Sequence, residues 1–219
     1  MTSVIPVFPL NTVVFPGQHL PLHIFEPRYR QLVQDVLGED REFGIALIAQ
    51  GREVGGGAEP VAVGCAVRIT EVQELPDGRY NIICEGTRRF RLVEQLGESP
   101  YLRAAVEFLA LPEDTRDEET TELAESVGEL YRDHLGLNLA MEGGWQRRMK
   151  SPTDPVRLAD TVAAEIEAPA GEKQEILSAE RLATRLEIGQ RLLEAANRSL
   201  AEQLRVRRRY KIGGLGAWN

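Results

Sequence analysis

The sequence predicts an α+β fold, in which a small β-barrel of mostly antiparallel strands with one inserted helix is followed by a C-terminal helical bundle. Two observations predict it. Up to residue 111, short apolar segments are interrupted by proline and glycine, a pattern typical of short, bent barrel strands. After residue 122, apolar residues recur at helical spacing instead. The 219 residues, 42% of them apolar, suffice for a core in each part.

The first apolar segment carries prolines that a flat central strand could not accept. Strands are expected at 6–10 and 20–25, joined by a turn for which Pro16 and Gly17 suit the central positions. Proline has no N–H for the ladder, so these strands belong at edges and corners. The prolines therefore favour a barrel over an open, flat sheet.

The inserted helix is expected from Glu26 to Leu37. Pro27 suits the first helical position, where its missing N–H costs nothing, and Gly38 can end the helix in the left-handed conformation. Apolar runs predict further strands at 43–49 and 101–111.

A long hairpin is expected from strands 61–75 and 79–96, which flank the turn residues Pro76-Asp77-Gly78. Cys65 and Cys84 lie at different distances from this turn. Their stagger is roughly 20 Å at about 3.3 Å per residue. A disulfide needs Cα atoms within about 7 Å, so both cysteines are expected to be reduced, buried thiols.

The composition changes at 112–122, where acidic residues predominate. Like charges discourage packing, so this stretch is expected to be a linker. Beyond it, helices are predicted, one with Asp154 as cap and Pro155 as first residue, one at 171–177 and one from Ser178 onward. The expected divisions are a barrel lobe at 1–111, an acidic linker at 112–122, a helical lobe at 123–210 and a flexible tail at 211–219.

The charge and hydropathy pattern exclude several classes of partner. A formal net charge of −8 argues against broad, sequence-independent binding to nucleic acid. No charged-then-apolar leader opens the chain, and no apolar run approaches the roughly 20 residues that cross a bilayer. We therefore expect a cytoplasmic protein with no membrane partner.

Motifs that would indicate catalysis are missing from the sequence. None of the lysines ends a Gly-x-x-x-x-Gly-Lys loop, and neither a Gly-x-Ser-x-Gly elbow nor a His-Glu-x-x-His pair occurs. The two cysteines do not form a Cys-x-x-Cys motif. We therefore expect no enzymatic activity, no cofactor and no metal site.

One basic cluster on a predicted strand can be interpreted in two ways. Arg88, Arg89 and Arg91 surround Phe90, a pattern compatible with RNA backbone contacts and base stacking. The same alternation also fits a strand with arginines toward water and Phe90 inward. The second interpretation is favoured, and RNA binding is kept as the alternative.

Three segments are specific enough to indicate a family. They are "PVFPLNTVVFPGQHLPLHIFEPRYRQLV", "FGIALI" and "VGCAVRITEVQELPDGRYNIICEGTRRFRL". Together they resemble the N-terminal substrate-binding domain of the Lon ATP-dependent proteases, and more closely its free-standing bacterial relatives. The later "DPVRLADTVAAEI" and "EKQEIL" resemble the helical part of the same domain.

The resemblance implies a PUA-like β-barrel plus a helical bundle, which Lon uses to recognise unfolded or tagged proteins. The matching positions are mainly turn and core residues: Pro9, Leu10, Phe15, Pro16, Gly17, Pro21, Leu22, Phe25, Gly64, Gly78 and Gly86. Full-length Lon continues into an ATPase with a phosphate loop and a protease with a Ser-Lys dyad, and this chain contains neither. A peptidase label would therefore come from the family name.

The resulting hypothesis is a non-enzymatic module that binds exposed or unfolded protein segments, in quality control or in delivering clients to an ATP-dependent protease. Phe15, Phe25 and Tyr29 are the expected peptide-binding residues. A homodimer is a further expectation. The alternative is an RNA-binding PUA-like module that uses Arg88, Arg89 and Arg91.

Overall fold

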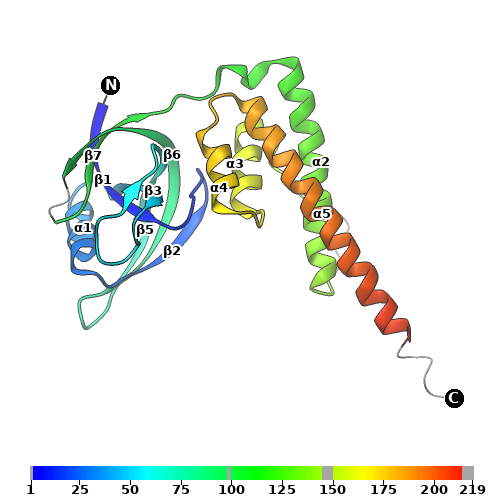
Figure 1. Cartoon of the computed structure of the whole chain (residues 1–219), viewed down its shortest axis with the longest axis horizontal. Helices are drawn as coiled ribbons and strands as arrows, with labels where there is room; N and C mark the ends of the chain where they lie inside the picture. Colours follow the sequence, from blue (N-terminus) through cyan, green and yellow to red (C-terminus); the bar gives the residue numbers. More distant parts are fainter. Residues whose placement is uncertain (1, 98–99, 145–149, 214–219) are drawn as a thin grey trace. The chain divides into compact units, whose positions relative to one another are not determined.

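The computed structural model describes residues 2–97, 100–144 and 150–213. The chain forms two compact units (Figure 1). The barrel unit comprises Met1–Pro112 and Pro169–Glu180, and the helical unit comprises Glu113–Ala168 and Arg181–Asn219. The α+β class predicted from the sequence is confirmed.

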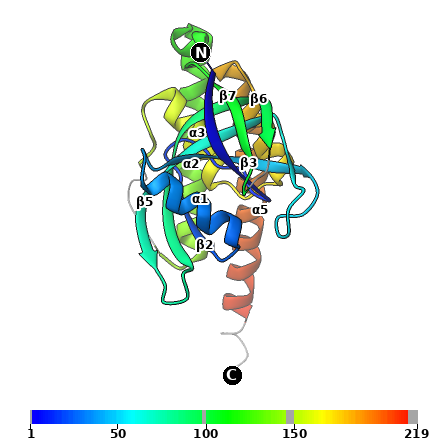
Figure 2. The ribbon, with the colours of Figure 1, turned by 90° about the vertical axis from the view of Figure 1, so that its left-hand side faces the viewer.

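The barrel unit is built from antiparallel strands, with one parallel pairing that closes the ring (Figure 2). Five strands pair in the order β1-β7-β6-β5-β3, and β3 returns to pair with β1. The elements are β1 (Thr2–Leu10), β2 (His19–Ile24), α1 (Pro27–Leu37), β3 (Glu42–Gln50), β4 (Glu59–Pro60), β5 (Val63–Glu74), β6 (Tyr80–Gly97), β7 (Arg103–Phe108) and α4 (Ala170–Ser178). The short β4 pairs with β3, and β2 pairs with β6.

Strand β1 changes partners part-way along its length. Residues 2–6 pair antiparallel with β7, and residues 7–10 pair parallel with β3. Pro6 is the last residue paired with β7. Its missing N–H therefore falls where the strand leaves one neighbour for the next, a position that tolerates proline.

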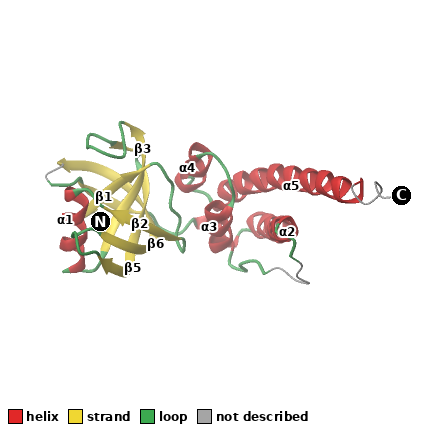
Figure 3. Cartoon of the chain, turned by 90° about the horizontal axis from the view of Figure 1, so that it is seen from below, coloured by secondary structure: helices red, strands yellow, loops and turns green. Residues whose placement is uncertain are grey.

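Both faces of β1 are buried from Val7 to Leu10, which explains why this half of the strand is continuously apolar. Val7 faces a cluster that includes Phe90, Ala104 and Val106. Phe8 faces a second cluster, where its ring stacks on Tyr29 of α1 with centroids 3.7 Å apart. Helix α1 lies on one side of the strands (Figure 3) and completes this second core.

Three glycines were expected in turns or at a helix end, and two of them have the expected backbone conformation. Gly17 and Gly78 have φ of 79° and 76°, a region that favours glycine in tight turns. Gly38 does not adopt the expected left-handed conformation, since its φ is −77°. Instead Arg41 is left-handed at φ 62°, and its N–H donates to the Val36 carbonyl at 2.9 Å.

The helical unit packs α2 (Glu118–Met141), α3 (Pro155–Glu165) and α5 (Leu182–Gly213) around an apolar core. The predicted cap of α3 is confirmed, because the Asp154 carboxylate accepts from the Arg157 N–H at 2.8 Å. Helix α5 begins at Leu182, later than the expected Ser178, which is the last residue of α4. The core residues include Val127, Leu158, Val162, Leu186 and Leu193.

The observed units differ from the expected divisions in two ways. Helix α4 groups with the barrel rather than with the other helices. There the Gln174 side chain donates to the Val63 carbonyl at 2.9 Å. The expected tail begins inside α5, which extends to Gly213, and residues 214–219 lie outside the described residues.

The acidic stretch expected to be a linker forms helix starts instead. A short 3₁₀ helix, η1, spans Glu113–Arg116, and α2 begins at Glu118. Acidic side chains are favourable in a first helical turn, near the positive end of the helix dipole. The Asp114 carboxylate accepts from the backbone N–H groups of Leu182 and Ala183 at 2.8 and 3.0 Å, so it caps α5.

We expect Asp114→Asn to destabilise the helical unit at neutral pH by about 0.5–2 kcal/mol, because the amide nitrogen of asparagine cannot accept one of the two backbone N–H groups and the negative charge is lost. Desolvation raises the pKa of Asp114, but the hydrogen bonds from Ala183 and Leu182 outweigh it and hold the pKa below its usual value. A depressed carboxyl pKa stabilises the fold above the unfolded pKa, and this contribution is lost as the pH falls through the folded pKa. Urea unfolding at several pH values should therefore show the difference between variant and parent shrinking below about pH 4. A difference that stays constant in acid would contradict this role.

Candidate functional site

The hairpin of β5 and β6 extends beyond the closed ring, and β2 joins it there. Residues 19–24 of β2 pair with 80–85 of β6, which pair in turn with β5 around residues 69–74. The result is a three-stranded sheet with β6 at its centre. Its inner face packs against α1 through Ile24, Ile69, Tyr80, Ile82 and Cys84.

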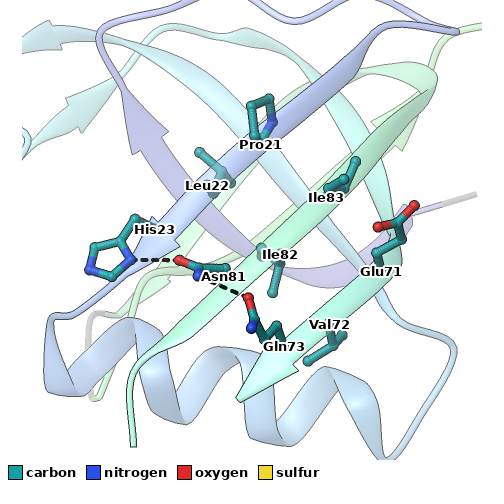
Figure 4. A pocket seen from close by; sticks show the side chains of 9 residues that line it. All are labelled: Pro21, Leu22, His23, Glu71, Val72, Gln73, Asn81, Ile82 and Ile83. Atoms are coloured by element: carbon teal, nitrogen blue, oxygen red, sulfur yellow. Dashed lines mark hydrogen bonds between the residues drawn. The ribbon is translucent and has the colours of Figure 1, made fainter. Parts of the chain in front are cut away.

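The outer face of this sheet carries a shallow pocket of about 400 Å³ (Figure 4). Its walls come from all three strands: Pro21, Leu22, His23, Glu71, Val72, Gln73, Asn81, Ile82 and Ile83. Pro21 and Ile83 supply its outward aliphatic side chains, whereas Ile82 belongs to the buried core and Leu22 packs against that core. We refer to this surface as the β2–β6–β5 pocket.

A row of polar side chains crosses the three strands at one side of the pocket. His23 Nδ1 and Asn81 Oδ1 are 2.8 Å apart, and Asn81 Nδ2 donates to Gln73 Oε1 at 3.2 Å (Figure 4). With the Asn81 amide nitrogen engaged with Gln73, the Asn81 oxygen accepts from His23 in the tautomer that carries its hydrogen on Nδ1. These polar groups bond to one another, which leaves the aliphatic side chains of Pro21 and Ile83 to contact a ligand.

Strand β2 has an open edge beside the pocket. Among the described strands it pairs only with β6. The Gly86 N–H donates to the Gln18 carbonyl at 2.9 Å, so even-numbered residues of β2 direct their backbone toward β6 and odd-numbered ones toward the open edge. Pro21 has no N–H, so the open edge offers the N–H groups of His19 and His23 together with the carbonyls of all three residues.

The three residues predicted to bind peptide lie in different environments. Phe15 and Tyr29 are core residues with 0% and 3% of their surface exposed, so their rings are not available to a partner. Phe25 is 48% exposed, directly after β2, and its ring stacks on His23 with centroids 6.2 Å apart. Only Phe25 of the three therefore adjoins the pocket.

The three arginines of the RNA alternative make contacts within the barrel unit. Arg88 pairs with Glu42 at 3.0 Å and lies 3.5 Å over the Phe108 ring. Arg91 pairs with Glu180 at 2.7 Å. Arg89 is buried, and its NH1 atom donates to the carbonyls at the end of α4, those of Leu177 and Ala179, at 2.9 and 2.7 Å. The three arginines thus hold parts of the barrel unit together. Phe90 is buried, as the interpretation favoured from the sequence requires. Arg89 is buried too, whereas that interpretation placed it toward water.

Sequence reasoning missed the residues that build the pocket, although one signal was present. The turn at Asp77-Gly78 sets the hairpin register, and counting outward from it places Gln73 opposite Asn81 and Glu71 close to Ile83. In the "NIIC" segment two isoleucines are adjacent, so one of them must face outward. That residue is Ile83, in the pocket wall.

The described residues show little that could support covalent or metal chemistry. No three histidine, cysteine or acidic side chains come together as a metal-binding group in this part of the chain. Both cysteines are buried thiols outside any disulfide, and burial raises the pKa of the Cys84 thiol to about 12. Cys84 is therefore a protonated thiol and a poor nucleophile at neutral pH. No helix within the described ranges is long and apolar enough to span a bilayer.

Comparison with known proteins identifies the family. Residues 4–195 match the family described as the ATP-dependent protease La (LON) substrate-binding domain. The chain belongs to this family. The Lon proteases of Anaeromyxobacter dehalogenans and Myxococcus xanthus are each 30% identical to it over 198 residues, 90% of this chain.

Solved structures agree with the family assignment. A Lon N-terminal domain protein from Xanthomonas campestris is 26% identical, with a TM-score of 0.62 over 84% of this chain and 95% of that one. The N-terminal domain of a Mycobacterium avium complex Lon protease shares the fold at 21% identity, with a TM-score of 0.64 over 88% of this chain and 98% of that one. This confirms the resemblance predicted from the sequence.

The match is to a substrate-binding domain and not to a whole protease. The chain spans about a quarter of the curated relatives it matches, 23% and 24% of the two Lon proteases named above. A substrate-binding role is therefore supported by the family.

Proposed function

We propose that this Lon substrate-binding domain binds exposed, unfolded segments of proteins at the open edge of β2 and the adjoining β2–β6–β5 pocket. The observation that supports the proposal is that the open edge of β2 and the pocket belong to the same three-stranded sheet. An open strand edge offers backbone hydrogen bonds, and the aliphatic pocket next to it accepts side chains.

An extended segment would add as a further strand beside β2. Its backbone would donate to the open carbonyls of His19, Pro21 and His23 and would accept from the two histidine N–H groups. Alternate side chains of a strand point to the same face, about 7 Å apart. Every second side chain of the segment would therefore lie on the outer face, beside Pro21 and the exposed Phe25 ring.

The site selects unfolded chains by the state of their backbone. In a folded protein, strand edges are already paired or protected, and apolar side chains are buried. An unfolded segment supplies both free backbone groups and aliphatic side chains. Pro21 limits the hydrogen bonds available, so the interaction should be weak and reversible, as suits a module that must release its client.

We further propose that bound segments are passed to an ATP-dependent protease, and that binding needs no ATP and cuts no peptide bond. The family match to a substrate-binding domain supports a binding role. RNA binding is not favoured, because the arginines it would require already pair with Glu42, Glu180 and backbone carbonyls.

Ile83→Asp is expected to weaken binding of an unfolded, apolar peptide at least about tenfold, because a carboxylate in an aliphatic pocket costs more than 1.4 kcal/mol. Fluorescence anisotropy of a labelled peptide with alternating leucine and serine would measure it. The matched control is Val54→Asp, which places the same charge at an exposed aliphatic residue in a loop that does not line the pocket. Equal affinities for the two variants, with unchanged circular dichroism, would refute the site.

Strand addition itself can be tested on the peptide. N-methylation at alternate residues removes the N–H groups along one edge of an extended peptide and leaves those of the other edge intact. We expect one of the two alternating patterns to abolish binding and the other to be tolerated. If both patterns bind as well as the parent peptide, the peptide does not pair with β2.

A further inference from the structure

The helical unit contains a second surface that the proposed peptide site does not use. Helices α2 and α5 run side by side (Figure 1), and a partly buried polar network joins them. His134 Nδ1 lies 2.9 Å from Asn197 Oδ1, and Asn197 Nδ2 donates to the Leu130 carbonyl at 3.0 Å. These bonds hold the two helices in one register.

A groove of about 580 Å³ runs between the two helices. It is lined by Leu130, Arg132, Asp133, Gly136, Leu137, Glu194, Asn197, Arg198 and Ala201. The aliphatic residues here are only half-buried. Gly136 and Ala201 are small, and a Cβ added at Gly136 would meet nothing within 4 Å, so another helix could approach closely.

Charge is distributed unevenly along the helix pair. The start of α2 carries exposed acidic residues, among them Glu122 and Glu129. The later part of α5 carries exposed arginines, among them Arg198 and Arg205. Because the two helices start together, with Asp114 just before α2 capping the start of α5, the acids gather at one end of the pair and the arginines toward the other.

We propose that a second copy of the chain occupies this groove, with its α2–α5 pair running in the opposite direction. A two-fold axis through the groove would place the acidic end of each copy against the basic end of the other. At 1.5 Å per residue, Arg205 lies about 11 Å along the helix from the middle of the groove. In the opposite direction, Glu129 lies about 7 Å and Glu122 about 17 Å from the middle. In the reversed copy, Arg205 would therefore fall between these two acids. The acids of one copy and the arginines of the other are therefore spaced so that they can meet.

The rim of the groove fits the same arrangement. It carries two arginines, Arg132 and Arg198, and two acids, Asp133 and Glu194. A rim with equal numbers of each sign can pair with a reversed copy of itself without net repulsion. The small residues at its floor let the half-buried leucines of the two copies interdigitate, which supplies the apolar contribution to dimer formation.

The oligomeric state of the full chain tests the proposal. Light scattering after size exclusion should give the mass of two 24.4 kDa chains at high concentration, falling toward one on dilution. Ala201→Arg should raise the dimer dissociation constant at least about tenfold, because its bulk fills the groove where the small side chain lets the two copies pack closely. Ala195→Arg is the matched control, since Ala195 is exposed on the same helix and does not line the groove. A chain that is monomeric at every concentration, or equal effects of the two substitutions, would overturn the proposal.

Charge reversal tests whether the charged ends of the two copies face each other. The double variants Glu122→Arg/Glu129→Arg and Arg198→Glu/Arg205→Glu should each be monomeric, because like charges then face each other at both ends. An equimolar mixture should form a heterodimer, since opposite charges again meet at both ends. A mixture that stays monomeric while the parent chain dimerises would show that these four side chains do not face one another across the interface.

Discussion

Gly86→Ala is expected to abolish folding of the barrel unit. A Cβ at this position would lie 2.1 Å from the backbone oxygen of Phe15 and 2.9 Å from its carbonyl carbon. The Gly86 carbonyl accepts from the Gly17 N–H at 2.7 Å and the Gly86 N–H donates to the Gln18 carbonyl at 2.9 Å, so two bonds hold the strand against the turn that follows Phe15. Relief would require breaking these bonds, and we expect a loss of about 3 kcal/mol or more in the free energy of unfolding.

The matched control for this change is Gly171→Ala, in α4 of the same unit. A Cβ there would meet nothing within 4 Å, and alanine is a better helix former than glycine. Urea unfolding followed by circular dichroism should show the control at least as stable as the parent, and the Gly86 variant unfolded or strongly shifted to lower urea. A Gly86→Ala protein with the parental midpoint would mean that β2 and the Phe15 turn approach β6 less closely than the structure has them.

Asp160→Ala is expected to destabilise the helical unit by about 3–5 kcal/mol, the usual effect of removing one partner of a buried ion pair. Asp160 and Arg185 are both buried, and their side chains form a direct ion pair between α3 and α5. Without the carboxylate, the guanidinium would remain in the core with its charge no longer balanced. The loss of the helical signal on urea titration measures the effect.

The double variant Asp160→Leu/Arg185→Met separates the cost of an isolated charge from the contribution of the pair. Removing both charges and replacing them with aliphatic side chains of similar size should cost much less than Asp160→Ala alone, because buried pairs contribute little net stability. Asp133→Ala, at an exposed position on α2, controls for loss of an acidic side chain. Equal losses in the single and double variants would indicate that Asp160 acts through packing and not through charge.

Elements defined by neighbouring residues could be predicted from the sequence. Pro27 and Asp154-Pro155 mark helix starts, and Gly78 marks the hairpin turn, because each acts through its own backbone conformation or a bond to a residue close by in the chain. The prolines of the first strands indicated a bent, cornered sheet for the same reason. The family resemblance rested on these same turn and core positions.

The candidate site could be predicted only in part. Phe25 adjoins the pocket, but Phe15 and Tyr29 are buried, since the sequence does not show which face of an apolar segment another element will cover. Phe8 stacks on Tyr29, a contact between residues far apart in sequence. The outward position of Ile83 followed from the hairpin register, but the pocket also needs β2 on the far side of β6.

The sequence by itself determined the α+β class, the order of strands and helices, the hairpin and the family, because periodicity, caps and turns are local properties. Only the tertiary structure decided how the charges are used. The acidic stretch expected to be a linker became helix starts and the cap of α5, and the arginines expected on a surface became ties to Glu42, Glu180 and the end of α4. A charged side chain lowers its free energy by finding an oppositely charged or hydrogen-bonding partner. In these cases the partner lies 46 to 90 residues away, where local sequence carries no information about it.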